Sequence, residues 1–543
     1  MNTAVRLLVL LFAPVAAGVA QPAHPSGPQK PAMLFGGMGR HRHPIATGNP
    51  EAQRFFDQGL VLLYGFNREE ALRSFRRSGE LDPRSPMPHW GIAMAVGPHI
   101  NGDTDLDVDR RSSCEAAAIA LRLAAQAPEH ERAYVGALVA RCAPAADDPA
   151  RDAAYRAAIG RLARGYPDDL DAQTLHAESI MILRRWRWWN RDGTPAEGTE
   201  EALRMLESVL RRDPDHPGAN HLFLHAVEMS PSPERALSSA QRLMGVVPAA
   251  GHLIHMAGHI YLLLGDYEMA ASANERAAAV DEEYIRQVGP SHGPYQLGYY
   301  PHNLHFIVYA RSAQGRFQEA QRAADRLIAQ VAPGYDAMPE MVEYYLPNRY
   351  FVLVRFRRWD DLLALPAPDA KWRTTTAFWR WARALAQSAK GRPDEARIEQ
   401  HTFEEARRQV PPKTMWLFNT VPEMLNLAAE VLQARLAADR ETAVAHWRKA
   451  VALQDALLYD EPPAWFFPVR ESLGGALLKA GRAAEAETVF RADIERNRRN
   501  GRSLFGLLES LKAQGKTFEA GWVRREFDAA WRKAEIHLRV EDL

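Results

Sequence analysis

Three histidines lie close together in the segment "GHLIHMAGHI", residues 251–260: His252, His255 and His259. Spacings of three and four residues place the three imidazoles on one face of an α-helix, within roughly 60° of one another. Histidine is the commonest metal ligand in proteins, and its neutral ring binds copper, zinc, iron or nickel. The segment therefore predicts a helix with one face suited to binding a metal ion.

Two other segments, residues 217–228 and 301–309, repeat this arrangement. They contribute the following groups: His221, His225 and Glu228 from the first, and His302, His305 and Tyr309 from the second. Glu178 has the corresponding place in a segment that begins near residue 170. We expect the seven histidines to be metal ligands, and Glu228, Glu178 and Tyr309 to act as catalytic acid, base or phenol groups.

The elements that carry these residues are helical, and they recur. The segment "FFDQGLVLLYGFNREEALRSFRRSGELDP" carries Gly59, Ala71 and Phe75, and "LGGALLKAGRAAEAETVF" carries Ala486 and Phe490 at matching positions. Both resemble the tetratricopeptide repeat (TPR), a helix–turn–helix unit of about 34 residues with small residues where its helices touch. Strand-like alternation is nearly absent. We therefore predict an all-α fold, a TPR-type helix–turn–helix superhelical solenoid of about ten to eleven repeats.

The repeats can be placed along the chain by aligning their small residues. Clear units begin at residues 52, 217, 251, 301, 343, 377, 424, 467 and 501, and a unit near 170 is lengthened by a Trp-rich insertion. Residues 86–165 look like two degenerate units. The predicted organisation is a signal peptide (1–20), a flexible lead-in (21–50), N-terminal repeats (51–165), central repeats with the histidine-rich site (166–334) and C-terminal repeats (335–543).

This register accounts for the histidine spacing. In a solenoid, the first helix of each repeat turns one face to the concave surface and packs its other faces against neighbours. All seven histidines, Glu178 and Glu228 fall on the concave face, whereas His176 falls on a packing face. Adjacent first helices lie roughly 10 Å apart. Imidazoles from three such helices can therefore converge on one or two points.

The identity of the metal stays open at this stage. Two sites of three imidazoles each would resemble a coupled dicopper centre in ligand type, which favours oxygen or phenol chemistry. A zinc pair with Glu178 or Glu228 as bridge or base would favour hydrolysis, and iron is a third option. The alternative is a non-enzymatic TPR scaffold whose concave groove binds a peptide or partner protein, or stores metal, with the histidines as hydrogen-bonding groups. For an enzyme we expect a small-molecule substrate in that groove.

Composition limits the other function classes. Lys plus Arg and Asp plus Glu are each 67, so the formal net charge is zero. The sequence therefore lacks the excess of basic residues that would indicate a nucleic-acid partner. The leader "MNTAVRLLVLLFAPVAAGVA" predicts a secretory signal peptide cleaved near Ala20, and no later segment is long enough to span a membrane. We expect a periplasmic or secreted protein. Cys114 and Cys142 are consistent with one disulfide or with two free thiols.

Three other segments are candidates for weaker roles. His41 and His43 in the lead-in either reach the groove or form a plain surface tract, and we expect the latter. The insertion "RRWRWWNRDG" either walls a substrate pocket or packs against the solenoid. The aromatic, Pro-broken segment "YDEPPAWFFPVR" at 459–470 predicts a packing role between repeats.

The order of motifs resembles a group of exported bacterial TPR proteins. The shared features are "FFDQGL-x-L-x-YGFN-x-EEA", "ANH-x3-HA-x-E", "H-x2-HM-x2-HIY-x4-GDY" and "YYPHN-x-HF", here at residues 55–71, 219–228, 252–267 and 299–306. The resemblance spans nearly the full length and implies that the histidine helices form a family site. It implies no particular activity. This chain departs from the pattern at Ala257 and Gly258, where the group often has Pro and Ser.

Overall fold

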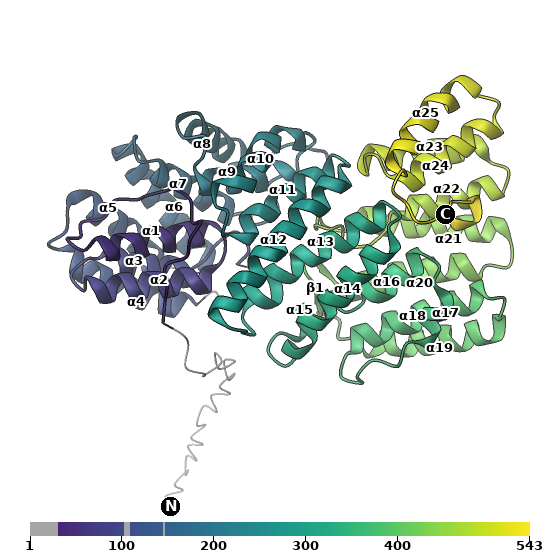
Figure 1. The fold of residues 1–543 in the computed structure, drawn as a ribbon, viewed down its shortest axis with the longest axis horizontal. Coiled ribbons are helices and arrows are strands. Elements are labelled where there is room, and N and C mark those ends of the chain that lie inside the picture. Colours follow the sequence, from purple (N-terminus) through teal and green to yellow (C-terminus); the bar gives the residue numbers. More distant parts are fainter. Residues whose placement is uncertain (1–30, 103–108, 145–146) are drawn as a thin grey trace, which may run out of the picture.

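The computed structural model describes residues 31–102, 109–144 and 147–543, so the predicted signal peptide lies outside the described residues. Helices follow one another as antiparallel hairpins, which stack side by side into a curved row (Figure 1). The predicted unit starts at residues 217, 251 and 501 coincide with the first residues of three helices. The all-α, TPR-type solenoid is therefore confirmed.

The N-terminal and central helices form the left and middle of Figure 1. Their bounds are α1 Pro50–Tyr64, α2 Arg68–Leu81, α3 Met87–Val96, α4 Arg110–Ala124, α5 Glu129–Val139, α6 Asp148–Gly165, α7 Leu170–Ile182, α8 Thr199–Arg212, α9 Pro217–Glu228, α10 Leu237–Val246, α11 Gly251–Leu263, α12 Tyr267–Val288, α13 Tyr300–Ala313 and α14 Phe317–Val331.

The C-terminal helices complete the row. Their bounds are α15 Pro339–Tyr345, α16 Asn348–Arg355, α17 Trp359–Ala364, α18 Arg373–Ala389, α19 Pro393–Gln409, α20 Val421–Leu436, α21 Arg440–Ala456, α22 Val469–Lys479, α23 Ala483–Arg496, α24 Gly501–Ala513 and α25 Thr517–Ala530. A two-residue antiparallel hairpin, β1 Met415–Trp416 and β2 Asn419–Thr420, precedes α20. Short turns of helix lie at Ala140–Cys142, Pro233–Ala236, Tyr295–Tyr299, Ala332–Gly334 and Val540–Asp542 (η1 to η5).

Small residues let large rings fill the space between helices. A Cβ atom added at Gly59 or at Gly91 would lie 2.7 or 2.4 Å from the ring of Phe75, so the ring needs glycine on both neighbouring helices. Phe490 has the same relation to Gly474, 2.4 Å from a Cβ added there. Both phenylalanines are fully buried. The same packing solution thus recurs some 400 residues apart, which is what a repeat predicts.

The concave face of the central repeats is covered by a later part of the chain. The segment between α21 and α22, residues 457–468, runs back against α13, α16 and α18. Its Trp465, Phe466 and Phe467 are buried. The prediction of a packing role for this segment is confirmed. The concave surface beside α13 is consequently not an open groove.

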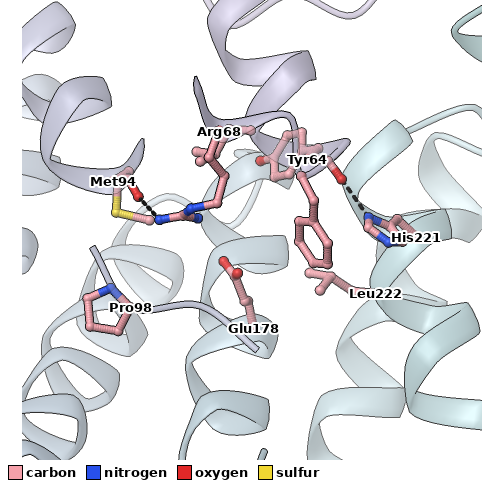
Figure 2. Close-up of a pocket in the computed structure, with 9 residues that line it drawn as sticks. Tyr64, Arg68, Met94, Pro98, Glu178, His221 and Leu222 are labelled. Atoms are coloured by element: carbon pink, nitrogen blue, oxygen red, sulfur yellow. Dashed lines mark hydrogen bonds between the residues drawn. The ribbon is translucent and has the colours of Figure 1, made fainter. Parts of the chain in front are cut away.

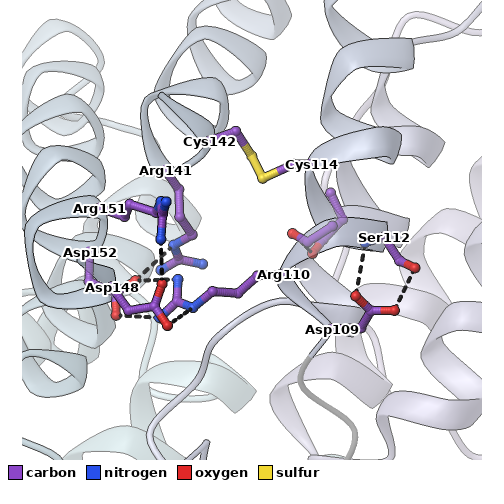
Figure 3. The surroundings of a disulfide bond; sticks show 11 residues. Asp109, Arg110, Ser112, Cys114, Arg141, Cys142, Asp148, Arg151 and Asp152 are labelled. Carbon is purple, nitrogen blue, oxygen red and sulfur yellow. Dashed lines mark hydrogen bonds and ion pairs between the residues drawn. A yellow bond between two sulfur atoms is a disulfide. The ribbon is translucent and has the colours of Figure 1, made fainter. Parts of the chain in front are cut away.

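Cys114 and Cys142 form a disulfide that ties α4 to the short turn η1 (Figure 3). Close by, the buried Asp152 accepts hydrogen bonds from Arg110 and pairs with Arg141, which also stacks over the ring of Tyr155. Of the two options left open by the sequence, the disulfide is the one observed. Within the described residues, no helix is both long enough and apolar enough to cross a membrane.

Candidate metal centre

Six of the seven predicted histidines gather into two adjacent triads at the centre of the solenoid. The first triad is His221, His225 and His252, and the second is His255, His259 and His302. Within each triad, one ring nitrogen of every member lies within 4.8 Å of the others. The ring centroids of His252 and His255, one from each triad, are 5.3 Å apart, so the triads are neighbours. All lie on α9, α11 and α13, as the repeat register predicts.

Hydrogen bonds at Nδ1 fix the orientation of several rings. The Nδ1 atom of His221 donates to the carbonyl oxygen of Tyr64 at 2.5 Å, and that of His255 donates to Oδ1 of Asn274 at 2.6 Å. Carbonyl oxygens only accept, so the proton sits on Nδ1 and the lone pair on Nε2. Anchoring one nitrogen of histidine to an acceptor is the usual way in which proteins prepare the other nitrogen for a metal.

Glu228 links the two triads through its carboxylate. Its Oε1 accepts from Nδ1 of His225 at 2.7 Å, and its Oε2 accepts from Nδ1 of His259 at 2.6 Å. The side chain is fully buried, and burial raises its pKa. Because both oxygens are engaged by imidazole N–H groups, the geometry favours a positioning role for Glu228 over that of a free catalytic base.

The remaining ring nitrogens face one another. Nε2 of His252 is 3.2 Å from Nε2 of His221, and Nε2 of His259 is 2.8 Å from Nε2 of His255. Nε2 of His225 is buried and has no hydrogen-bond partner among the described residues. His221 and His255 carry their protons on Nδ1 and so present Nε2 lone pairs, and a buried lone pair without a donor, such as Nε2 of His225, is costly. A metal ion between them would satisfy these atoms together, so the donor set fits a transition metal.

Burial keeps most of the triad rings neutral. It lowers the pKa of His221, His225, His252, His255 and His302, and neighbouring imidazoles lower it further. Neutral rings offer the lone pairs that metals need. His259 differs: burial opposes its protonation, but the carboxylates of Glu228 and Glu461 outweigh burial and raise its pKa to about 10.

A phenylalanine covers each triad. The ring of Phe66 lies 4.4 Å from that of His221 and 5.3 Å from that of His252, measured between centroids. The ring of Phe306 lies 4.8 Å from those of both His255 and His259. Phe66 and Phe306 are buried. These rings exclude water from the two triads, which strengthens electrostatic interactions there.

The glycine at 258 makes room for one of the anchors. A Cβ atom at Gly258 would lie 2.2 Å from Nδ2 of Asn274, the residue whose Oδ1 holds His255. Asn274 is fully buried, and its Nδ2 donates to the carbonyl of Ala270 at 2.8 Å. The amide therefore has no free space into which it could turn. Glycine at this position allows α11 to pack closely on α12.

Replacing Gly258 by Ala is expected to displace Asn274 and release the ring of His255. We expect a loss of about 1–3 kcal/mol in the free energy of unfolding, measured by chemical denaturation, because the site is tightly packed. Gly136→Ala, in α5, is a matched control because no atom lies within 4 Å of a Cβ there. It is expected to be neutral or stabilising by up to about 1 kcal/mol. Equal effects of the two substitutions would contradict the packing argument.

The other predicted site residues lie outside the triads. His305 packs against Tyr344 and Tyr345, with ring centroids 5.5 and 5.7 Å away. Tyr309 is buried against Phe466, 5.7 Å between centroids. Glu178 faces a cavity of about 10 Å³ beside Arg68 and His221 (Figure 2), and burial raises its pKa. The structure therefore does not bring these three side chains into the histidine triads.

One contact of the site comes from a distant segment that sequence reasoning treated only as packing. Glu461, in the segment 457–468, places Oε2 2.8 Å from Nδ1 of His259. The hydroxyl of Tyr459 donates to the other carboxylate oxygen. Burial raises the pKa of Glu461 to about 7. Acidic residues within an otherwise aromatic, buried segment were the available signal for this role.

The Trp-rich insertion packs against the solenoid and also reaches the first triad. Trp188 is buried and donates to the carbonyl of Met181 at 3.0 Å, which fastens the insertion to α7. Trp186 is partly exposed and faces the site, with ring centroids 5.3 Å from His225 and 4.9 Å from Phe418 of the β-hairpin. Trp186 therefore forms part of the wall around the first triad.

The expectation of a plain surface tract at His41 and His43 is wrong. Both rings bind the buried Asp171 of α7: Nε2 of His41 lies 3.0 Å from Oδ1, and Nδ1 of His43 lies 2.8 Å from Oδ2. The hydroxyl of Tyr64 donates to the same carboxylate at 2.6 Å. Asp171 thus binds two side chains of the extended segment 31–49, which also hydrogen-bonds to Asp57 and Gln58 of α1. The sequence pattern gave no indication of this long-range pairing.

The cluster of His41, His43, His216 and Asp171 is less suited to binding a metal ion than the two histidine triads are. Nδ1 of the neighbouring His216 accepts the backbone N–H of Ala219 at 3.1 Å and so caps α9. Its proton must therefore be on Nε2, which lies 3.3 Å from Asp171. Two imidazoles and a phenol hydrogen-bond one carboxylate, and a third imidazole nitrogen lies near it. The cluster is a hydrogen-bonded clamp on the N-terminal segment.

The clamp is expected to be pH-dependent. Burial opposes ionisation at Asp171, but His41, His216 and His43 hold its pKa well below the ordinary value of 3.8. Burial also disfavours charged His41 and His43, but Asp171 raises their pKa above 6.5. The contribution of the charged imidazoles to the stability of the clamp is complete below pH 6.5. It is lost as the pH rises through the raised pKa values of His41 and His43 in the folded protein. The carboxylate contribution is present above pH 3.8 and is lost as the pH falls through the folded-state value.

Segment 31–49 should therefore be held most tightly between about pH 4 and pH 6.5. Hydrogen exchange of its amides, corrected for intrinsic rates, should be several-fold faster at pH 8.5 than at pH 5.5. Asp213 near His41, and Asp169 and Asp57 near His43, favour the charged rings in the same direction. The Asp171→Asn variant should lose most of this pH dependence. An unchanged profile in that variant would assign the dependence to other groups.

Comparisons with known proteins give little further information. No family model matches the chain. A stretch of 61 residues is 41% identical to an uncharacterized protein of Aquifex aeolicus, covering 11% of this chain and 8% of the length of that relative. Among solved structures, the human IFIT1 dimer with m7Gppp-AAAA has a TM-score of 0.33 at 12% identity, covering 90% of this chain and 91% of that one. Yeast Tom70 has a TM-score of 0.32 at 12% identity, covering 87% and 96%. Such values carry no argument about function.

Proposed function

We propose that this chain is an exported metalloprotein that binds two transition-metal ions, one in each histidine triad. The observation that carries the proposal is the convergence of the triad nitrogens, with four of the six rings, His221, His225, His255 and His259, anchored at Nδ1. Three imidazoles from separate turns of helix are a sufficient ligand set for copper or zinc. A metal bound by three protein ligands keeps a position free for substrate or water, as a catalytic site requires.

Copper with oxidase or oxygenase activity is the preferred form of this proposal. The triads contain nitrogen donors of neutral rings, and the one carboxylate between them, Glu228, has both oxygens bonded to Nδ1 atoms. A carboxylate bridge, which would favour a zinc hydrolase or an iron centre, therefore has weaker support. When bound, a copper pair would supply one-electron redox chemistry toward oxygen or phenols. The protein's own residues hold the rings, and Phe66 and Phe306 exclude water.

A small-molecule substrate is favoured over a peptide in the groove. The segment 457–468 is buried against the concave face, and Trp186 and Phe418 stand beside the first triad. An extended peptide would have to displace that segment. Of the other predicted catalytic groups, Tyr309 packs against Phe466, whereas Glu178 lines a small cavity together with His221 of the first triad.

The test is elemental analysis of untagged protein purified from the exported fraction, followed by reconstitution with Cu²⁺ and Zn²⁺. Two equivalents of copper support the proposal and call for oxygen-consumption assays with phenolic and amine substrates. One or two equivalents of zinc would contradict the oxidase proposal and favour a hydrolase, which would then be assayed on esters and amides. No metal, and no uptake on reconstitution, would overturn the metalloprotein proposal and leave a partner-binding scaffold.

A further inference from the structure

A second cavity, far from the triads in sequence, is lined by an excess of positive charge. It has a volume of about 350 Å³ and lies where α16, α20, α22 and α24 meet the short helix η5. Five cations line it, Arg355, Arg357, Arg435, Lys479 and Arg502, against three acids, Glu471, Glu541 and Asp542. No part of the proposed metal chemistry uses this cavity.

Two of the five cations are neutralised within the protein. Arg355 forms a two-pronged pair with Glu471, in which Nη2 donates to Oε1 at 3.0 Å. Arg357 pairs with Asp542 and also donates to the carbonyl of Glu541 at 3.0 Å. The carboxylates of Glu471 and Asp542 are thus committed to these two guanidinium groups, whereas Glu541 offers Arg357 only its main-chain carbonyl.

The other three cations form no ion pair with a side-chain carboxylate within the described residues. Arg435 donates to Oγ of Ser472 at 3.2 Å and to the main-chain oxygen of Leu543 at 3.0 Å. Arg502, only 4% exposed, donates to the carbonyls of Asp542 and Arg355, both at 2.7 Å, and its Nε has no hydrogen bond within the described residues.

The ammonium of Lys479 pairs with none of the described residues. Lys479 is an exposed residue; partial burial of its ammonium and the charges of Arg435 and Arg357 lower its pKa, and Glu541 acts in the opposite direction. Burial also lowers the pKa of Arg502, to about 9. Both directions mean that positive charge in this cavity is disfavoured by its surroundings. An anion would relieve that cost.

We propose that this cavity is a binding site for a phosphate group. Guanidinium groups suit phosphate because their N–H donors match pairs of phosphate oxygens, and a lysine adds a compact charge. Arg435, Lys479 and Arg502 supply these groups from three different helices, and the ring of Trp447, 4.9 Å from the guanidinium of Arg435, supports that side chain. The cavity is larger than one phosphate, so the group is either free inorganic phosphate or part of a small phosphorylated metabolite.

Isothermal titration of the full chain at pH 7.5 and constant ionic strength tests this proposal. Inorganic phosphate and glucose 6-phosphate are the two probes, and chloride and unphosphorylated glucose are the blanks. Saturable binding of either probe is expected, with one site per chain. Tighter binding of the sugar phosphate would assign the site to a phosphorylated metabolite, and equal binding would assign it to phosphate alone.

Variants connect the binding to this cavity. Lys479→Ala and Arg435→Gln should each weaken binding at least tenfold, whereas Lys413→Ala, an exposed lysine in the turn before β1, should have no effect. Circular dichroism should show that the variants stay folded, since neither cation lies in the main core. Absence of saturable binding by the parent protein, or equal weakening by all three substitutions, would overturn the proposal.

Discussion

Replacing His221 or His255 by Ala is expected to leave one metal equivalent in each single variant and none in the double variant. The two residues belong to different triads, and each has its Nδ1 anchored so that Nε2 faces the other rings of its own triad. Loss of one of three protein ligands removes most of the affinity of that site. The measurement is metal content by elemental analysis after dialysis against a weak chelator.

His305→Ala provides the matched control for this experiment. His305 is as deeply buried as the triad histidines and stands on the same helix as His302, but it packs against Tyr344 and Tyr345. Its removal creates a similar cavity and should cost similar stability. Full retention of two metal equivalents is expected. If His305→Ala lost as much metal as His255→Ala, the loss in the triad variants would reflect damage to packing, and the assignment of ligands would fail.

The repeat register was sufficient to predict which helices carry the site. Small residues at positions such as Gly59 and Gly474 fix how two helices approach, and that approach fixes which face of a first helix is concave. From that register, the side chains on α9, α11 and α13 could be predicted to converge. What the register cannot resolve is a shift of one helical turn. His302 and His305 both lie on the predicted face, yet His302 joins the second triad and His305 lies beside Tyr344.

Contacts made by residues distant in sequence were not predictable from spacing. Glu461 reaches His259 only because the chain returns over the concave face after α21. This return brings together two residues that are about two hundred positions apart in the sequence. The carbonyl of Tyr64 holds His221, although a backbone atom leaves no signature in the sequence. His41 and His43 likewise find Asp171 through the course of an extended segment that has no period. Local periodicity therefore identified the candidate ligands, whereas tertiary packing determines which groups orient them.

Substitution of Glu228 is expected to change the metal affinity of one triad more than that of the other. In Glu228→Gln, the amide retains one oxygen that can accept from Nδ1 of either His225 or His259, but its NH₂ group cannot accept from the other ring. Nδ1 of His259 also lies 2.8 Å from Oε2 of Glu461, so His225 is the ring that can lose its acceptor and carry its proton on Nε2. A proton on Nε2 blocks metal binding through that atom. One site should weaken by about 10–100-fold while the other is retained. Glu228→Ala removes both oxygens of this carboxylate, but Glu461 remains for His259, so the first triad should again weaken more than the second.

Competition titrations with a chromophoric chelator would measure the two affinities separately. Glu178→Gln is the matched control, because Glu178 is a carboxylate of the neighbouring repeat whose pKa is also raised by burial, but it faces the small cavity beside Arg68 (Figure 2). It should leave both affinities unchanged. If Glu228→Gln bound two metals as tightly as the parent protein, Glu228 would not orient the rings. If Glu178→Gln weakened both sites, the catalytic role expected for Glu178 from the sequence would have to be extended to metal binding, which its present contacts do not explain.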